Sequence, residues 1–183
     1  MEDNNILVTI SGPPAAGTST VAGGLSDELG FEHISGGDMF RQMAEERDVT
    51  LDELTKAAQR DASIDKQLDT RLESVITEYL NGDFDVDGTG LIVESRLAGW
   101  HAGDDATVSV YLDAPINIRV NRITGRDETV SELESREESE IQRYKEYYGV
   151  DITDVNMYDL IINTYENSPK HVINQIKEEL PNK

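Results

Sequence analysis

Near its N-terminus the chain reads Gly12-Pro13-Pro14-Ala15-Ala16-Gly17-Thr18-Ser19, directly after the short apolar run Ile6-Leu7-Val8-Thr9-Ile10. The β-branched and aliphatic composition of that run is typical of a buried strand, and the glycine and prolines after it signal a tight turn. From Ser19 to Leu29 apolar residues recur at helical spacing, and Gly30 then provides a stop signal. The sequence therefore predicts a strand, a glycine-rich loop and a helix, in that order.

The two glycines and Ser19 have the spacing of the phosphate-binding P-loop, GxxxxGK[ST], in the strand-to-helix context that this motif requires. In such a loop, backbone N–H groups surround phosphates and the N-terminus of the helix adds partial positive charge. Ser19 would offer its hydroxyl to Mg²⁺. Thr18 occupies the position of the motif's lysine, which normally contacts the β- and γ-phosphates. The alternative is a turn that only joins strand to helix, but the context favours a phosphate loop.

Strands and helices alternate along the rest of the chain. Because each expected strand is short and wholly apolar, the pattern indicates an α/β fold with a parallel sheet of about five strands, covered by helices on both faces. We expect further strands at about 32–34, 91–93, 107–112 and 160–162. We expect further helices beginning at Gly37-Asp38 with Asp38 as the cap, continuously over 50–80, from about 115, up to about 149, and over 168–180.

The chain of 183 residues has 37 acidic and 16 basic residues, a formal net charge of −21 and a pI near 4.3. Such a charge repels nucleic acid phosphates, which argues against nucleic acid as a partner. Disorder fits poorly because the apolar segments are periodic. We therefore interpret the acidity as adaptation to high salt, where screening removes much of the self-repulsion.

Cysteine is absent, which excludes disulfides and thiolate metal sites, and a zinc enzyme is not expected. The sequence has no apolar run long enough to cross a bilayer, and its acidic start is unlike a signal peptide. We expect a single cytoplasmic domain over 1–183, without membrane partners and acting as a monomer.

Arginines are the main candidates for phosphate binding, because each offers a planar and permanently charged fork. Each one alone is better explained by pairing with surface carboxylates, but together they suggest convergence on a polyphosphate. Glu94, at the end of an expected strand, has two open interpretations: it acts through water on Mg²⁺, or it caps the next loop. We expect the run Glu128 to Glu140 to be mainly a solvated face. The six arginines near expected element boundaries are Arg41, Arg96, Arg122, Arg126, Arg136 and Arg143.

Seven ordered segments together resemble the archaeal type of cytidylate kinase, almost from end to end. The P-loop alone is unspecific, whereas the ordered set is specific for nucleoside monophosphate kinases. The segments are Ser11-Gly12-Pro13-Pro14, His33-Ile34-Ser35-Gly36-Gly37-Asp38-Met39-Phe40-Arg41, Glu94-Ser95-Arg96-Leu97-Ala98-Gly99-Trp100, Arg122-Ile123-Thr124-Gly125-Arg126, Arg136-Glu137-Glu138-Ser139-Glu140, Arg143-Tyr144-Lys145-Glu146-Tyr147-Tyr148-Gly149 and Tyr158-Asp159-Leu160-Ile161-Ile162-Asn163-Thr164.

The resemblance implies a role for each part of the chain. Residues 35–80 would form a helical segment that binds the acceptor nucleotide, and residues 126–145 would form a lid. Ser19 would bind the metal. The implied ATP-binding residues are Gly12, Pro13, Pro14, Ala15, Ala16, Gly17, Thr18, Ser19 and Thr20; the acceptor-binding residues are Ser35, Gly36, Asp38, Arg41 and Arg96; the catalytic residues are Arg122, Arg126, Arg136 and Arg143.

The reaction that the resemblance implies is transfer of the γ-phosphoryl group of ATP, with Mg²⁺, to CMP or dCMP, giving ADP and the cytidine diphosphate. The acceptor phosphate is already an oxyanion, so positioning and charge neutralisation suffice without a general base. Two alternatives stay open: a kinase for AMP or UMP, and a nucleotide-binding module that lost turnover together with the lysine.

Overall fold

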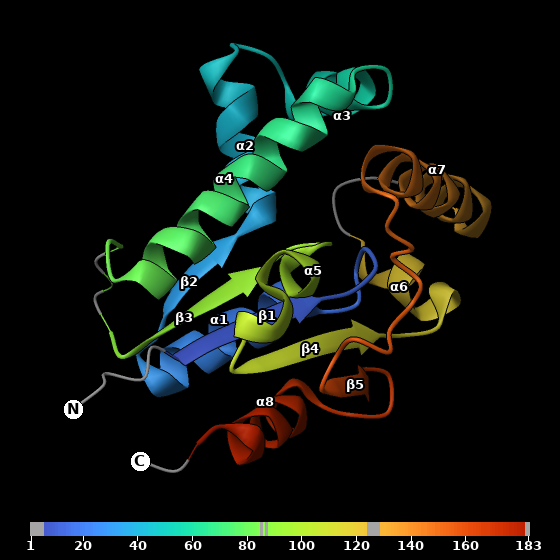
Figure 1. Cartoon of the computed structure of the whole chain (residues 1–183). Coiled ribbons are helices and arrows are strands. Elements are labelled where there is room, and N and C mark those ends of the chain that lie inside the picture. The colour runs from blue at the N-terminus through green and yellow to red at the C-terminus, as the bar shows by residue number, and fades with distance from the viewer. Residues whose placement is uncertain (1–5, 85, 87, 124–128, 182–183) are drawn as a thin grey trace.

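The computed structural model describes residues 6–84, 86, 88–123 and 129–181, and shows a parallel sheet between two layers of helices (Figure 1). The sheet has five strands in the order β2-β3-β1-β4-β5, and every neighbouring pair is parallel. The predicted α/β class and five-stranded parallel sheet are confirmed. The strands are β1 (Ile6–Ser11), β2 (Glu32–Ser35), β3 (Gly90–Glu94), β4 (Val108–Asp113) and β5 (Leu160–Asn163).

The central strand β1 is buried along its whole length and contributes side chains to two separate hydrophobic clusters. Because successive side chains of a strand point to opposite faces, Ile6, Val8 and Ile10 pack with α1 (Thr18–Leu29) and α8 (Pro169–Glu179). Leu7 instead joins the core formed with α4 (Ala62–Asn81) and α5 (Ala98–Ala102) on the other face. The continuous apolar run of β1 is thus explained by helices on both sides.

A third and smaller cluster holds α2 (Gly36–Glu46), α3 (Leu51–Ala58) and the start of α4 together through Met43, Leu54 and Ile64. The prediction of one continuous helix over 50–80 is wrong, because the chain turns between α3 and α4. Asp61 caps the new helix, since its side chain accepts a 2.9 Å hydrogen bond from the backbone N–H of Ser63.

The start of α2 also differs from the prediction. Ser35, not Asp38, is the N-cap, and its hydroxyl accepts a 3.3 Å hydrogen bond from the Asp38 backbone N–H. Asp38 lies three positions after the cap, in the first turn of the helix, where its negative charge still suits the positive end of the helix dipole.

Two further helices lie between β4 and β5 in the chain. They are α6 (Ile116–Arg122) and α7 (Val130–Tyr148). Thr129 and Glu132 form a reciprocal capping box at the start of α7, and Gly149 ends the helix with φ of 69°. Residues 98–105 form α5 and a short 3₁₀ helix, which periodicity did not predict.

The carboxyl ends of the parallel strands lie at one edge, where β1 enters the loop that leads to α1. In open parallel sheets this edge is where ligands bind. Among the described residues, no helix is both long and apolar enough to cross a membrane.

Candidate active site

The loop between β1 and α1 is curled tightly against the sheet. A Cβ on Gly12 would lie 2.3 Å from the backbone oxygen of Leu112, so only glycine fits there. Gly17 has φ of 99°, and Ala15 adopts φ of 61°, which is uncommon for a residue with a side chain. Strained backbone of this kind clusters at ligand sites. The loop borders a cleft of about 570 Å³ that Arg122 and Thr164 also line.

Glu94 lies at the end of β3 and joins the loop to the neighbouring strand. Its Oε1 accepts hydrogen bonds from Thr18 Oγ1 at 2.6 Å and from Ser19 Oγ at 2.8 Å. Burial acts to raise the pKa of Glu94, but nearby His33 and these hydroxyls lower it by more, so the pKa lies below its usual value. Glu94 is therefore a buried, ionised carboxylate beside the predicted metal residue Ser19.

Arg96 follows Glu94 and reaches the start of the loop. Its Nη1 donates a 2.6 Å hydrogen bond to the carbonyl oxygen of Gly12, and its Nε donates at 3.0 Å to Oε2 of Glu140 on α7. Arg96 therefore links the P-loop to α7.

Arg119, on α6, makes a second link between the loop and α7, and the sequence analysis did not select it. The residue is 5% exposed. Its guanidinium donates to the carbonyl oxygens of Ala114 and Pro14, and forms a two-pronged ion pair with the carboxylate of Glu137. A buried guanidinium beside the P-loop is a group that can serve phosphate chemistry.

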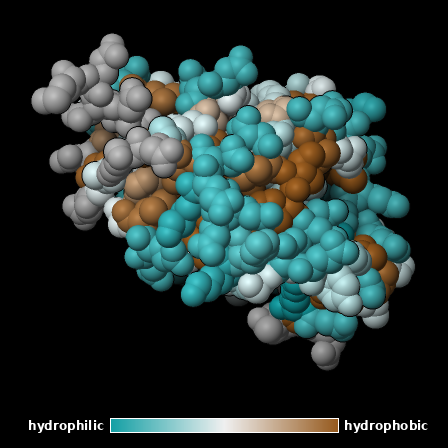
Figure 2. All heavy atoms as spheres, turned by 90° about the horizontal axis from the view of Figure 1, so that it is seen from below, coloured by the Kyte–Doolittle hydropathy of each residue, from teal (hydrophilic) through white to brown (hydrophobic). Residues whose placement is uncertain are grey.

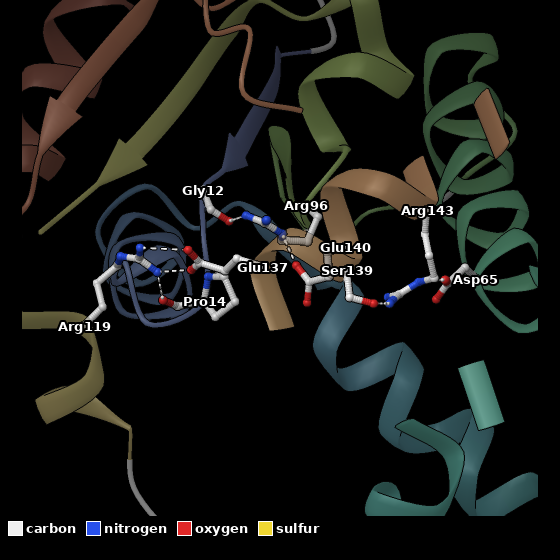
Figure 3. A network of polar contacts seen from close by, with 9 residues as sticks. All are labelled: Gly12, Pro14, Asp65, Arg96, Arg119, Glu137, Ser139, Glu140 and Arg143. Atoms are coloured by element: carbon white, nitrogen blue, oxygen red, sulfur yellow. Dashed lines mark hydrogen bonds and ion pairs between the residues drawn. The ribbon is translucent and has the colours of Figure 1, made fainter. Parts of the chain in front are cut away.

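Arg143 completes a row of ion pairs that runs from the P-loop to α4 (Figure 3). Its Nε lies 3.0 Å from Oδ2 of Asp65, and its Nη1 donates to Ser139. Burial raises the pKa of Asp65 even though Arg143 acts to lower it. Glu137 and Glu140 belong to this row, so the prediction that residues 128–140 form mainly a solvated face is wrong at these two positions.

The remaining predicted catalytic arginines have different surroundings. Arg122, the last residue of α6, donates to Thr164 Oγ1 at 2.9 Å and to the Thr164 carbonyl oxygen at 3.0 Å, at the edge of the cleft. Arg136 and Arg143 lie in the interior of α7, not at element boundaries as predicted. Arg126 falls outside the described residues.

The predicted acceptor-binding residues lie around the start of α2. A Cβ on Gly36 would come within 2.8 Å of Ser95 Cβ, so this glycine permits close approach of α2 to the residue after β3. Arg41 is exposed and pairs with Asp38 three residues earlier. Ser35 and Gly36 are therefore next to Glu94 and Ser95, whereas Arg41 lies further along the helix.

Sequence reasoning missed the carboxylate half of the site. Asp65, Glu137 and Glu140 resemble many other acidic residues of this chain, and only tertiary contacts distinguish them. Arg119 did carry a signal, because it lies three residues before Arg122 on the same helix and would share its face.

The sequence of the chain is similar to those of known proteins. The model of the cytidylate kinase-like family matches residues 7–166. The cytidylate kinase of Halobacterium salinarum is 49% identical over 172 residues, which cover 91% of this chain and 85% of that protein. The cytidylate kinase of Sulfurisphaera tokodaii is 37% identical over 172 residues, covering 91% of each chain.

Solved structures support the fold independently of sequence. A shikimate kinase from Bacteroides thetaiotaomicron superposes with a TM-score of 0.62 at 14% identity, covering 94% of this chain and 97% of that one. A shikimate kinase from Aquifex aeolicus gives a TM-score of 0.59 at 14% identity, covering 95% of each chain. At such low identity the similarity concerns the fold alone.

Proposed function

The chain belongs to the cytidylate kinase-like family of phosphotransferases, and on this premise we propose that it transfers the γ-phosphoryl group of ATP to CMP or dCMP. The observation that carries the proposal is the row of arginines beside the P-loop. Arg96, from the loop after β3, and Arg119, on α6, both pair with glutamates of α7, and Arg143 on α7 itself pairs with Asp65 of α4.

In this proposal the donor triphosphate lies on residues 12–20, in the cleft that Arg122 borders. The backbone N–H groups of the loop and the N-terminus of α1 bind its phosphates. Ser35, Gly36, Asp38, Arg41 and Arg96 bind the acceptor nucleotide, and the arginines of the lid, Arg122, Arg126, Arg136 and Arg143, close on the group in transfer. These assignments follow the family resemblance position by position.

Ser19 and Glu94 suit the Mg²⁺ that accompanies ATP. Hydroxyl and carboxylate oxygens are ligands that Mg²⁺ accepts directly or through water. Within the described part of the chain, Oε2 of Glu94 is buried without a hydrogen bond and lies 3.7 Å from Nε2 of His33, which leaves this oxygen of an ionised carboxylate available to a metal. Ser19 and Glu94 would hold this ion, which would supply positive charge to the phosphates.

The proposed transfer depends on positioning of the two nucleotides and on neutralisation of their charge, more than on acid–base catalysis. A CMP phosphate is already an anionic nucleophile, so the arginines need only hold it in line and offset the charge that develops. Closure of the lid over small nucleotides would exclude water and prevent hydrolysis of ATP. We include a monomeric state and a cytoplasmic location in the same proposal.

The decisive experiment is a coupled ADP-release assay with ATP and Mg²⁺ in molar KCl. CMP, dCMP, UMP and AMP are compared in parallel with a reaction that lacks an acceptor. We expect ADP release with the cytidine nucleotides. In folded protein that binds ATP, release without dependence on an acceptor, or preference for AMP or UMP, would contradict the proposal.

Arg96→Ala tests the site within the same assay. We expect turnover to fall by about 100-fold or more, as for other losses of a preorganised donor to developing charge. Arg71→Ala is the matched control, because Arg71 pairs with Glu46 between α4 and α2 and contacts neither the loop nor α7 in the ion pairs described. Near wild-type turnover of Arg96→Ala would refute the role of Arg96.

A further inference from the structure

The P-loop of this chain has a threonine where the motif has a cation. The hydroxyl of Thr18 is already directed at Glu94, with the two oxygens 2.6 Å apart. Arg122 is the basic residue among the described residues that line the cleft, and its guanidinium is held by neutral oxygens of Thr164. The charge that a lysine would bring to the β- and γ-phosphates must come from elsewhere if transfer is to be efficient.

Arg119 is fixed at the tip of the loop by neutral acceptors. Its Nε donates to the Ala114 carbonyl oxygen at 2.8 Å, and its Nη1 donates to the Pro14 carbonyl oxygen at 3.1 Å. These bonds set the plane of a guanidinium that is almost fully buried. A buried charge of fixed orientation is costly to keep without an anionic partner.

The anionic partner in this structure comes from the lid helix. The two Nη groups of Arg119 face the two carboxylate oxygens of Glu137, and Nη2 lies 3.1 Å from Oε2 (Figure 3). A phosphoryl group presents paired oxygens that the same fork accepts in the same manner. The fork of Arg119 is therefore shaped for phosphate and occupied by a carboxylate.

We propose that Arg119 supplies the positive charge missing at Thr18, by donating its fork to the β–γ end of the ATP triphosphate in exchange for Glu137. The inference rests on the proposed function. Arg119 is then a catalytic residue of the transfer, and Glu137 is the anion that holds the fork when no nucleotide is bound. The competing explanation is that the pair only fastens α6 to α7.

Binding of single nucleotides separates these explanations without any turnover. The full chain and its Arg119→Gln and Arg119→Lys variants are titrated with MgATP and, separately, with CMP by calorimetry in molar KCl. We expect Arg119→Gln to weaken MgATP binding by about 10- to 100-fold, as for lost hydrogen bonds to a charged group. Binding of CMP should stay within about twofold, and Arg119→Lys should recover part of the affinity for MgATP.

The control for this experiment is Arg71→Gln, which breaks another two-pronged ion pair, with Glu46, away from the loop. Its affinity for MgATP should equal that of the wild type. Equal losses of MgATP and CMP affinity in Arg119→Gln, or no loss of MgATP affinity, would overturn the proposal and leave the fastening role.

Glu137→Gln tests the exchange itself. The neutral amide no longer competes with phosphate for the guanidinium, so MgATP should bind several-fold more tightly. A tenfold change in affinity corresponds to about 1.4 kcal/mol. Glu138→Gln, at the next and exposed position of α7, should leave the affinity unchanged. Weaker or unchanged MgATP binding by Glu137→Gln would contradict competition for the fork.

A rescue experiment tests the replacement of charge. Thr18→Lys is added to Arg119→Gln and to the wild type, and thermal unfolding confirms that both are folded. We expect Thr18→Lys to raise kcat/KM for ATP at least tenfold more in the Arg119→Gln background than in the wild-type background. A folded double variant without recovery would overturn the proposal. If the wild type releases no ADP with CMP, the proposed function fails, while the MgATP titrations still report on Arg119.

Discussion

Gly12 starts the P-loop where the chain passes too close to β4 for any side chain. A Cβ there would meet the Leu112 backbone oxygen at 2.3 Å, and neither backbone segment can move freely inside the sheet. We expect Gly12→Ala to lower the free energy of unfolding by about 1–3 kcal/mol, the usual cost of overpacking. The measurement is urea unfolding in molar KCl.

Gly23→Ala is the matched control for that prediction. Gly23 lies inside α1, and a Cβ there would meet nothing within 4 Å. The better helix propensity of alanine should raise the free energy of unfolding by about 0.5–1 kcal/mol. Equal stability of Gly12→Ala and the wild type would contradict the close approach of the loop to β4.

Glu94 predicts a specific dependence of stability on pH. Because its pKa is lowered in the folded protein, the ionised carboxylate stabilises the fold above its unfolded pKa, and this contribution is lost as pH falls through the folded value. We expect Glu94→Gln to be less stable than the wild type by about 1.5–3 kcal/mol at pH 7, the range for hydrogen bonds to a charged group. The difference should shrink below the usual glutamate pKa of 4.5.

The measurement is urea unfolding of both proteins from pH 7 to pH 3 at constant KCl. The difference between the two free energies cancels the titration of the other carboxylates. A difference that grows on acidification would show that hydrogen bonding in the folded state does not lower the pKa of Glu94.

At the scale of single residues, the sequence predicted the residues that a local backbone motif requires. It missed the residues whose role depends on tertiary contacts. Gly12, Gly17 and Ser19 follow from motif spacing, because the backbone geometry of the loop dictates them. The pairing of Glu137 with Arg119 could not be predicted, since one glutamate in an acidic helix looks like the next until the helix is packed. The cap of α2 was misplaced by three residues because Ser35 and Asp38 are both good cap residues.

At the scale of elements, α7 is tied to α4 near its C-terminal end. The Tyr148 hydroxyl donates a 2.6 Å hydrogen bond to Oδ2 of Asp69, a buried carboxylate that also lies 3.3 Å from His101 Nε2. Burial, together with Asp69, holds the pKa of Tyr148 well above its usual value, so the phenol stays protonated and donates. We expect Tyr148→Phe to lower the free energy of unfolding by about 1.5–3 kcal/mol.

Tyr147→Phe is the control on the neighbouring residue. The ring of Tyr147 faces Lys66 Nζ at 5.6 Å, and phenylalanine keeps that face. Urea unfolding should therefore distinguish the two variants clearly. Similar free energies of unfolding for both would mean that the hydroxyl of Tyr148 does not anchor α7.

Helices and strands were predicted correctly where their apolar residues pack into the core. The predictions failed where one helix ends and the next begins. The strands β1 and β3 are buried along their whole length because helices cover both of their faces. The apolar stripe of α3 continues in phase into α4, which hid the turn before Asp61, although Asp61 itself is a start signal. The helix α5 has five residues, too few for periodicity to show.

At the scale of the whole molecule, the surface carries both charged side chains and hydrophobic patches. Figure 2 shows hydrophilic side chains over most of one face, with hydrophobic patches between them. The site uses several of the few basic residues in ion pairs, which leaves an excess of acidic side chains elsewhere. Self-repulsion among these carboxylates opposes the compact state unless it is screened.

This excess predicts that the fold depends on salt. The Debye length falls from about 10 Å at 0.1 M to about 3 Å at 1 M, so molar KCl screens most pairs of exposed carboxylates. We expect the midpoint of thermal unfolding to rise by about 10 °C between 0.1 M and 2 M KCl, which corresponds to roughly 3 kcal/mol for a chain of this size. Differential scanning calorimetry at several KCl concentrations measures the shift.

A less acidic variant distinguishes screening from the general effect of an excluded solute, which also stabilises folded proteins. Replacing four exposed carboxylates by amides, in Asp104→Asn, Glu134→Gln, Glu178→Gln and Glu179→Gln, changes the formal net charge from −21 to −17. If repulsion is the cause, this variant is more stable than the wild type at 0.1 M KCl and gains less from added salt, because fewer like charges remain to be screened. Sucrose, which raises stability without screening, should stabilise both proteins equally. Parallel salt curves for the two proteins would show that the acidic surface does not set the salt requirement.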